Sequence, residues 1–239
     1  MYRIRVRYEK KGRVKYLGHL EMIKVFERAF RRIGIPLKYT EGFNPHPKMS
    51  FALPSSVGFS SIGEYIDVEV TEAVRIGKFI EKMNSALPGG LKLIVGGYVD
   101  AKAKSLMSMV DYSEFEIDFP LDAEIDMDSI MELEKILESG PIPARKRTKS
   151  GKIVEKNLKE DIHGYETVNF KNNRIVLKVL LSAGSRGNLN PLFLLKGLGE
   201  KTGWNIDPHN VDVLRIDLFS KAEGGPLSLE ETVSEVEAK

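Results

Sequence analysis

The chain opens with a strict alternation of side-chain type. Apolar and aromatic residues occupy positions 2, 4, 6 and 8, while Arg3, Arg5 and Arg7 occupy the positions between them. A period of two predicts a β-strand over residues 2–8 that carries the arginines on one face. Further along, the apolar spacing changes to three or four residues at Leu20, Ile23, Phe26, Phe30 and Ile33. This spacing predicts an amphipathic helix that ends near Gly34.

The same two periods continue along the chain. In the first hundred residues they predict strands at 35–39, 49–53, 64–70 and 91–99, and a helix at 72–86. The order is then β-α-β-β-α-β, which is typical of a ferredoxin-like domain. The second half repeats that order, with strands at 111–119, 143–148, 152–158, 165–170, 174–181 and 211–219 and helices at 126–138 and from Pro191 on. We predict an α+β fold of tandem ferredoxin-like (β-α-β-β-α-β) domains, with an extra basic hairpin in the second.

This pattern divides the chain into three parts. Residues 1–104 form the first predicted domain and residues 105–220 the second. Residues 221–239 are acidic and weakly apolar, and we predict a disordered tail there, with a loosely docked helix as the alternative.

Composition narrows the chemistry that the chain can perform. The 239 residues are 42% hydrophobic, and no apolar run approaches the roughly 20 residues that span a bilayer. The N-terminus alternates like a strand and has no apolar signal core, so we expect a cytoplasmic protein. There is no cysteine, which excludes disulfides, thiol nucleophiles and cysteine-ligated clusters. The four histidines do not form the spaced pairs of zinc sites, and we expect no metal and no cofactor.

Charge is distributed unevenly, although the net charge is only +2. Residues 1–48 hold 13 Lys and Arg against 4 Asp and Glu, and residues 141–201 hold 13 against 5. The segments between and after them are acidic. Two interpretations stay open: internal compensation between basic and acidic elements, or two basic segments that form one surface for a polyanion.

The arginines of the first strand illustrate both interpretations. On an open face of a ferredoxin-like sheet, Arg3, Arg5 and Arg7 could bind RNA phosphates or stack on bases. The strand at 64–70 is its expected neighbour, and it carries Asp67 and Glu69. Cross-strand pairs with these carboxylates would instead neutralise the arginines.

The first helix carries a basic stripe of four residues, Lys24, Arg28, Arg31 and Arg32. This stripe is either an RNA contact or an ordinary solvated face. His19 lies where this helix begins, and a helix N-terminus disfavours the protonated imidazole. A neutral His19 could act as a general base, although a capping or packing role is the simpler alternative.

The segment EGFNPHPKMS, residues 41–50, is unsuited to a helix or a regular strand. Its two prolines hold Asn44 and His46 extended, because proline restricts the residue before it. We predict a stiff loop that presents Asn44, His46 and Lys48 at the edge of a binding cleft. His46 is the second candidate for catalysis.

Two segments of the second half are candidate anion sites. The segment ARKRTKSGK suggests a projecting basic hairpin that could bind phosphate, through Arg145, Lys146, Arg147 and Lys149. Arg186 lies in GSRGNLNP, between two glycines and before a predicted helix N-terminus. A solubilising surface loop is the alternative for the hairpin.

Several of these segments resemble a known family. The run GRVKYLGHLEMIKVFERAFRRIGIPLKYTEGFNPHPKMSFALPSSVGFSSIGEYIDVEV, with ARKRTKSGK and LLSAGSRGNLNP, resembles the radical SAM-linked protein family over most of residues 1–215. Its bacterial members are encoded beside, or fused to, a radical SAM protein, often near ribonuclease and ribosomal protein genes. The resemblance implies a radical SAM protein as partner and an association with RNA. Radical SAM chemistry needs a cysteine-ligated cluster, which the partner would have to supply.

A second similarity, of fold only, is to RNA-binding and RNA-cleaving proteins of CRISPR systems. Three functions follow for comparison. The first is a non-catalytic RNA-binding accessory module that presents a structured RNA to a radical SAM partner. The second is a metal-independent endoribonuclease that uses His19 or His46. The third is a protein-interaction subunit without nucleic acid, in which the arginines pair internally with Asp67 and Glu69.

Overall fold

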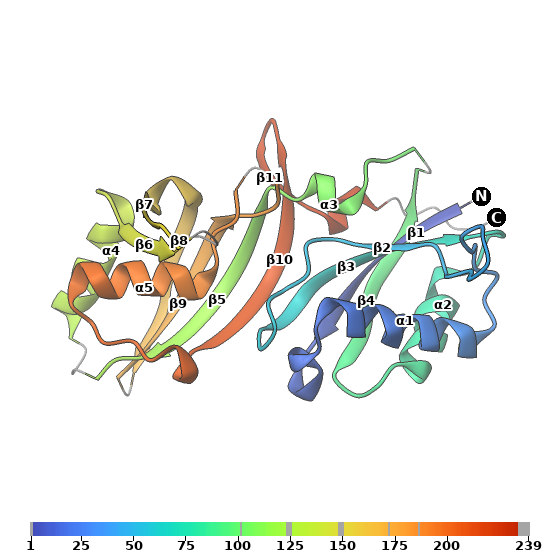
Figure 1. Ribbon diagram of the computed structural model, residues 1–239, viewed down its shortest axis with the longest axis horizontal. Helices are drawn as coiled ribbons and strands as arrows, with labels where there is room; N and C mark the ends of the chain where they lie inside the picture. The colour runs from blue at the N-terminus through green and yellow to red at the C-terminus, as the bar shows by residue number, and fades with distance from the viewer. Residues whose placement is uncertain are drawn as a thin grey trace. The chain divides into compact units, whose positions relative to one another are not determined.

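A computed structural model describes residues 2–100, 102–122, 126–147, 151–171, 173–185 and 187–233; of residues 146, 147 and 171 it describes only the backbone. The chain forms two compact units (Figure 1). Unit 1 combines Met1–Asp111 with Arg215–Lys239, and unit 2 is Tyr112–Leu214. This division differs from the predicted boundaries at 104 and 220, because the last part of the chain returns to the first unit.

Unit 1 contains four of the five strands predicted in the first hundred residues and both helices predicted there. They are β1 (Tyr2–Lys10), α1 (His19–Ile33), β2 (Met49–Phe51), β3 (Ser60–Val70), α2 (Ile76–Ala86) and β4 (Leu91–Val99). Strand β1 pairs antiparallel with both β3 and β4, and β2 pairs antiparallel with β3. The segment 35–39, predicted as a strand, makes only isolated bridges, from Leu37 to Val70 and from Tyr39 to Pro47.

The core of unit 1 lies between the sheet and its two helices, α1 and α2 (Figure 1). In this core the apolar side of β1 packs against the apolar side of α1, as the alternation of the strand and the three-to-four spacing of the helix predict. Phe26 is fully buried and meets the rings of Tyr8 and Phe51 edge-on, with centroids 5.1 and 5.5 Å away. Gly34 ends α1 at φ +62°, a left-handed conformation that glycine adopts without strain.

The opposite face of this sheet is covered, whereas the sequence predicted an open face. Short helix α3 (Leu106–Met109) and the 3₁₀ turn η4 (Glu230–Thr232) lie against it. Arg5 donates from Nη1 to the Oγ1 of Thr232 at 2.5 Å and reaches the Sδ of Met109 at 3.6 Å. The arginine face of β1 is therefore largely an interior surface of unit 1.

The predicted disordered tail is folded as far as residue 233, where the described chain ends. Strand β10 (Asp212–Ala222) continues into β11 (Gly225–Ser228), which pairs with it antiparallel. Leu229 is completely buried. A short apolar segment among acidic residues thus anchors the C-terminal part of the chain on unit 1.

Unit 2 contains the antiparallel strands β5 (Tyr112–Pro120), β9 (Arg174–Ser182) and β8 (Ile162–Lys171), with β9 paired to both of the others. Helices α4 (Met127–Glu138) and α5 (Pro191–Thr202) pack in this unit, and β6 (Pro143–Arg147) pairs with β7 (Ile153–Asn157) as the predicted hairpin. Asn190 caps α5, since its side chain accepts from the backbone N–H of Leu192 at 2.8 Å.

The fold is therefore α+β with mainly antiparallel sheet, as predicted. Among the helices in the described ranges, none combines the length and the apolar character that a membrane crossing requires.

Candidate functional site

Two adjoining cavities lie on unit 1, between α1, the loop at 40–48, β2 and residues 103–107. The first has a volume of about 590 Å³ and is lined in part by His19, Glu27 and His46. The second has a volume of about 340 Å³, and its lining includes Arg3 and Lys48. The two cavities share lining residues from the loop, from β2 and from the start of α3. We call this continuous surface the loop groove.

The loop at 40–48 is held at both ends by its own backbone. The Thr40 N–H donates to the His46 carbonyl at 2.8 Å, and the His46 N–H donates to the Thr40 Oγ1 at 3.0 Å. Lys48 continues the ladder by donating its N–H to the Lys38 carbonyl at 2.8 Å. Together with the two prolines, these bonds fix where His46 and Lys48 lie. Asn44 is exposed and lies outside both cavity linings.

His46 is oriented by a carboxylate of the neighbouring helix. Its Nδ1 lies 2.9 Å from the Oε1 of Glu27, whose side chain is largely buried. In this contact Nδ1 carries a proton toward the carboxylate, which leaves Nε2 available to a ligand in the groove. The role of Glu27 depends on a contact between residues that are 19 positions apart, so no local pattern in the sequence indicates it.

His19 is the first residue of α1, as predicted, and lies against the edge of Phe51, with the ring centroids 5.3 Å apart. Behind it is a small internal space that His19 lines together with Tyr8, Lys10 and Glu64. Burial lowers the pKa of Lys10, although the negative charge of Glu64 acts to raise it. Burial also raises the pKa of Tyr8. His19 therefore joins the exposed first cavity to a buried polar cluster.

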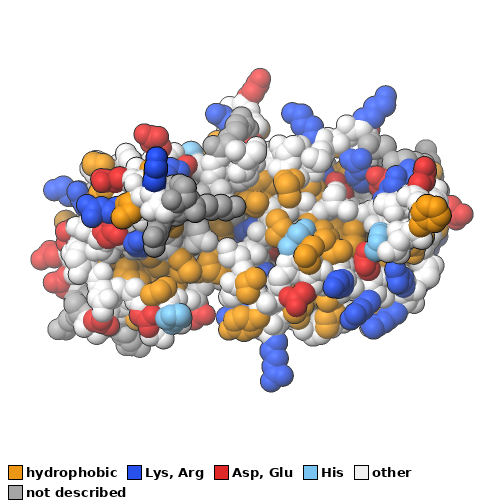
Figure 2. All heavy atoms as spheres, in the orientation of Figure 1, with side chains coloured by type: hydrophobic (Ala, Val, Ile, Leu, Met, Phe, Trp, Pro, Cys, Tyr) orange, Lys and Arg blue, Asp and Glu red, His pale blue; other side chains and the backbone are white. Residues whose placement is uncertain are grey.

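The basic stripe of α1 lies beside the groove. Ile23 and Glu27 line the first cavity, and Lys24 and Arg28 each follow one position later, roughly 100° around the helix. Lys24, Arg28 and Arg31 are exposed and have no carboxylate partner among the described residues. Figure 2 shows Lys and Arg side chains gathered along α1. Arg32, the fourth member of the stripe, donates to the Ala86 carbonyl at 3.3 Å.

The three arginines of β1 have different environments. Arg5 is only 1% exposed and makes a bidentate pair with Asp67, at 2.8 Å from Nε and 3.0 Å from Nη2. Arg7 pairs with Glu230 at 2.5 Å. Only Arg3 lines the groove, and it donates to the Ala103 carbonyl at 2.9 Å.

Cross-strand neutralisation is thus confirmed for Arg5, which lies directly opposite Asp67 in the β1–β3 register. Arg7 is also neutralised, but by Glu230 of the C-terminal segment instead of a residue of the neighbouring strand. Neither guanidinium faces an open sheet surface. Glu69 also lines the groove, but its carboxylate lies 3.5 Å from Lys38 rather than against Arg3.

The candidate residues of the second half belong to unit 2. Arg145 is exposed on β6, and its carbonyl accepts from the Nζ of Lys196 at 3.2 Å. Lys146 and Arg147 follow it on the same strand, and their side chains are outside the description. Lys149 and Arg186 lie outside the described residues. The two basic segments of the sequence therefore occupy different units.

Sequence reasoning missed the wall of the groove formed by Ser105 and Met107. Helix α3 has four residues, too few for a helical period to show in the sequence. Among the described residues, no three His, Asp or Glu side chains are grouped as a metal site.

Comparison with known proteins places this chain in a family. Residues 3–191 match the family model described as "Uncharacterized protein conserved in bacteria (DUF2344)", and the chain belongs to that family. No curated protein matches the sequence.

Among solved structures, a chain of the "Crystal Structure of a Cbf5-Nop10-Gar1 Complex" is similar, with a TM-score of 0.51 and 10% identity over 92% of this chain. A chain of the "Structure of H/ACA RNP bound to a substrate RNA containing 2'-deoxyuridine" has a TM-score of 0.46 and 9% identity over 89% of this chain. The protein spans about half the length of each, 50% and 46% respectively. At this identity the likeness concerns the fold.

Proposed function

We propose that this member of the conserved bacterial family is an RNA-binding module, and that RNA lies along the loop groove of unit 1. The observation that carries the proposal is the position of Lys24, Arg28 and Arg31, which are exposed and have no carboxylate partner within the part of the chain that the structure describes. They lie beside a groove that also contains Arg3 and Lys48. Exposed cations in a row beside a groove match the regular phosphates of a nucleic-acid backbone.

Two further features of the groove favour an anionic ligand. The prolines and backbone hydrogen bonds hold Lys48 in place, so a phosphate contact there would order little of the protein. The carboxylates that line the second cavity are matched by internal cations, Asp67 by Arg5 and Glu69 by Lys38. They therefore oppose an anion less than isolated carboxylates would.

The finer proposal is that both units are ferredoxin-like and that the module presents a structured RNA to a radical SAM partner. This chain has no cysteine to ligate an iron–sulfur cluster, so in this proposal it binds the RNA and the partner supplies the cluster. In this proposal Arg145, Lys146, Arg147, Lys149 and Arg186 of unit 2 provide additional phosphate contacts. Arg5 and Arg7 are omitted, since both are bound within unit 1.

The test is binding of a fluorescent RNA stem-loop with a single-stranded tail, measured by anisotropy between 50 and 200 mM salt. The variant Lys24→Gln/Arg28→Gln/Arg31→Gln should bind at least tenfold more weakly. Its log–log salt slope should be shallower by about 2, because three phosphate contacts are lost.

The matched control changes three exposed lysines of α2 and β4 in the same unit: Lys78→Gln/Lys82→Gln/Lys92→Gln. It removes the same charge away from the groove and should bind nearly as tightly as the wild type. Equal losses in both triple variants would show nonspecific attraction. Absence of RNA binding by the wild type would leave a protein-docking subunit, which the internal pairing of Arg5 and Arg7 also fits.

One observation favours a second function, metal-independent RNA cleavage: His19 and His46 line the same cavity, and Glu27 orients His46. In that reaction the neutral imidazole of His19 takes the proton of a 2′-OH, whose oxygen attacks the adjacent phosphorus. The bond from phosphorus to the 5′-oxygen breaks, and His46, in its protonated form beside Glu27, donates a proton from Nε2 to that oxygen. The products are a 2′,3′-cyclic phosphate and a 5′-hydroxyl.

Cleavage is tested by incubating labelled RNA with the wild type and with His19→Ala and His46→Ala in the presence of EDTA. Loss of product in both variants, with RNA affinity retained, supports the reaction. Cleavage that persists unchanged in both variants would exclude it.

A further inference from the structure

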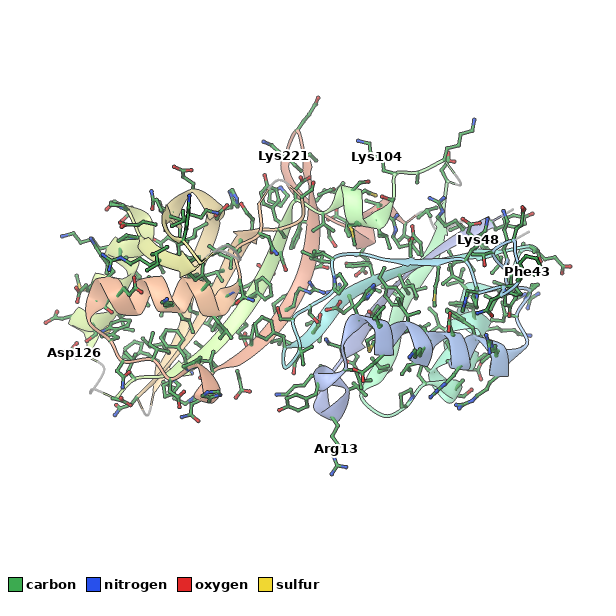
Figure 3. All side chains as sticks on the ribbon, in the orientation of Figure 1. Arg13, Phe43, Lys48, Lys104, Asp126 and Lys221 are labelled. Carbon is green, nitrogen blue, oxygen red and sulfur yellow. The ribbon has the colours of Figure 1, made fainter. Side chains whose placement is uncertain are left out.

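Phe43 is the most conspicuous side chain that the proposed function leaves unused. It lies in the loop at 40–48 and has 112% of its reference accessibility, so it makes essentially no contact that shields it from solvent. Figure 3 shows Phe43 at the outer edge of unit 1, on the same loop as Lys48. A phenylalanine so placed exposes a whole apolar ring to water.

The base of the loop that carries Phe43 is fixed. The bonds between Thr40 and His46, and the bridge between Tyr39 and Pro47, close the loop at its base. Pro45 also holds Asn44, the residue after Phe43, in extended geometry. The ring therefore points outward from a loop whose base is fixed, which is an arrangement suited to a binding anchor.

The positive charges of unit 1 favour a nucleotide as the ligand of the ring. Lys48 of the same loop, Arg3 of the groove and the cations of α1 lie in unit 1, whose first 48 residues are strongly basic. An apolar protein partner would gain little from these cations, whereas a nucleotide has both a flat base and a phosphate. We propose that Phe43 stacks on the base of an unpaired nucleotide whose backbone enters the loop groove at Lys48.

This proposal rests on the proposed function and makes it more specific. Bases in a duplex are stacked on one another and are not available to a protein ring, so the RNA must be single-stranded at this point. Aromatic stacking is tolerant of sequence because every base has a π-face. The predicted substrate is thus RNA with an unpaired segment, recognised without strong sequence preference at this position.

The first measurement compares affinities for a 12-nucleotide oligouridylate and for a 12-base-pair RNA duplex. Phe43→Ala should weaken binding of the single strand by about tenfold, within the range measured for base–aromatic stacking, and should leave duplex binding unchanged. Phe43→Leu retains an apolar side chain without a ring and should behave like Phe43→Ala. Phe43→Trp should bind as tightly as the wild type or more tightly.

The second measurement observes the ring itself. The chain has one tryptophan, Trp204, so Phe43→Trp in a Trp204→Phe background gives a single reporter in the loop. Stacking on uridine should quench its fluorescence as RNA is added. Vesicles of phosphatidylcholine with phosphatidylglycerol form a parallel arm, in which a blue shift would indicate insertion into an anionic membrane and would overturn the proposal.

The outcomes separate this proposal from the proposed function. If the wild type binds oligouridylate and Phe43→Ala binds it equally well, the stacking proposal fails while RNA binding stands. Equal losses for single strand and duplex would also overturn it. If the wild type binds neither RNA, the proposed function fails and the stacking proposal fails with it.

Discussion

Replacement of Asp67 by Asn tests whether Arg5 is part of the interior or part of a binding surface. Asp67 accepts two hydrogen bonds from Arg5, at 2.8 and 3.0 Å, and their side chains are 4% and 1% exposed. Asp67→Asn keeps the shape of the side chain but leaves the guanidinium buried without a counter-charge. Removal of one partner of such a pair costs about 3–5 kcal/mol of folding free energy. The contact of Arg5 with Thr232 remains, so the lower half of that range is expected.

The natural control is Glu69→Gln on the same strand. Glu69 lies 3.5 Å from Lys38, and the two side chains are 21% and 33% exposed. A partly exposed pair of this kind contributes at most about 1 kcal/mol. A second control, Arg5→Met with Asp67→Leu, removes both charges and should cost less than Asp67→Asn alone, because no unpaired charge stays buried.

The assay is urea denaturation at 25 °C, followed by circular dichroism and by tyrosine fluorescence, with a common slope for all variants. A cost below about 1 kcal/mol for Asp67→Asn, or a cost equal to that of Glu69→Gln, would refute the assignment of Arg5 to the interior. A loss of RNA affinity in folded Asp67→Asn that exceeds the loss for the groove variants would also contradict it.

Three further changes test other parts of the structure. Leu229→Ala should cost about 2–5 kcal/mol in urea denaturation, because Leu229 is fully buried where the C-terminal segment packs; a cost near zero would show that this segment does not dock. Gly63→Ala should lower the melting temperature by several degrees, since its Cβ would lie 2.4 Å from the backbone oxygen of Ile216; an unchanged melting temperature would contradict that close approach. Hydrogen bonds from the side chain and backbone of Ser129 lower the pKa of Asp126, so a carbon-detected NMR titration should show that carboxyl group protonating below its ordinary range, with Ser129→Ala raising the midpoint. The stability that this cap contributes is present above the ordinary pKa and is lost as pH falls through the lowered one; an unshifted midpoint would argue against the cap.

Local patterns predicted most of the elements. The alternation at residues 2–8 predicted β1, and the apolar spacing with Gly34 predicted the extent of α1. The order of elements also placed β1 beside β3, which is why pairing of Arg5 with Asp67 could be considered from sequence. These features depend on periods and caps that are contained within short stretches of chain.

Contacts between distant segments could not be predicted in this way. Arg7 pairs with Glu230 across 223 positions, and nothing in either segment signals the other. The same holds for β11 and Leu229, which sit in a stretch whose acidic composition favoured disorder. In the groove, the loop was predicted from its prolines, whereas the pairing of His46 with Glu27 required the packing of the loop on α1.

The central claim is that RNA lies along the loop groove of unit 1, and photochemical crosslinking tests it most directly. The full chain is mixed with RNA that contains 4-thiouridine in an unpaired segment, irradiated, digested and analysed by mass spectrometry. The account predicts crosslinked peptides from the loop at 40–48 and from α1, and their loss in Lys24→Gln/Arg28→Gln/Arg31→Gln. Crosslinks confined to other surfaces, with the groove peptides unmodified while RNA stays bound, would contradict it.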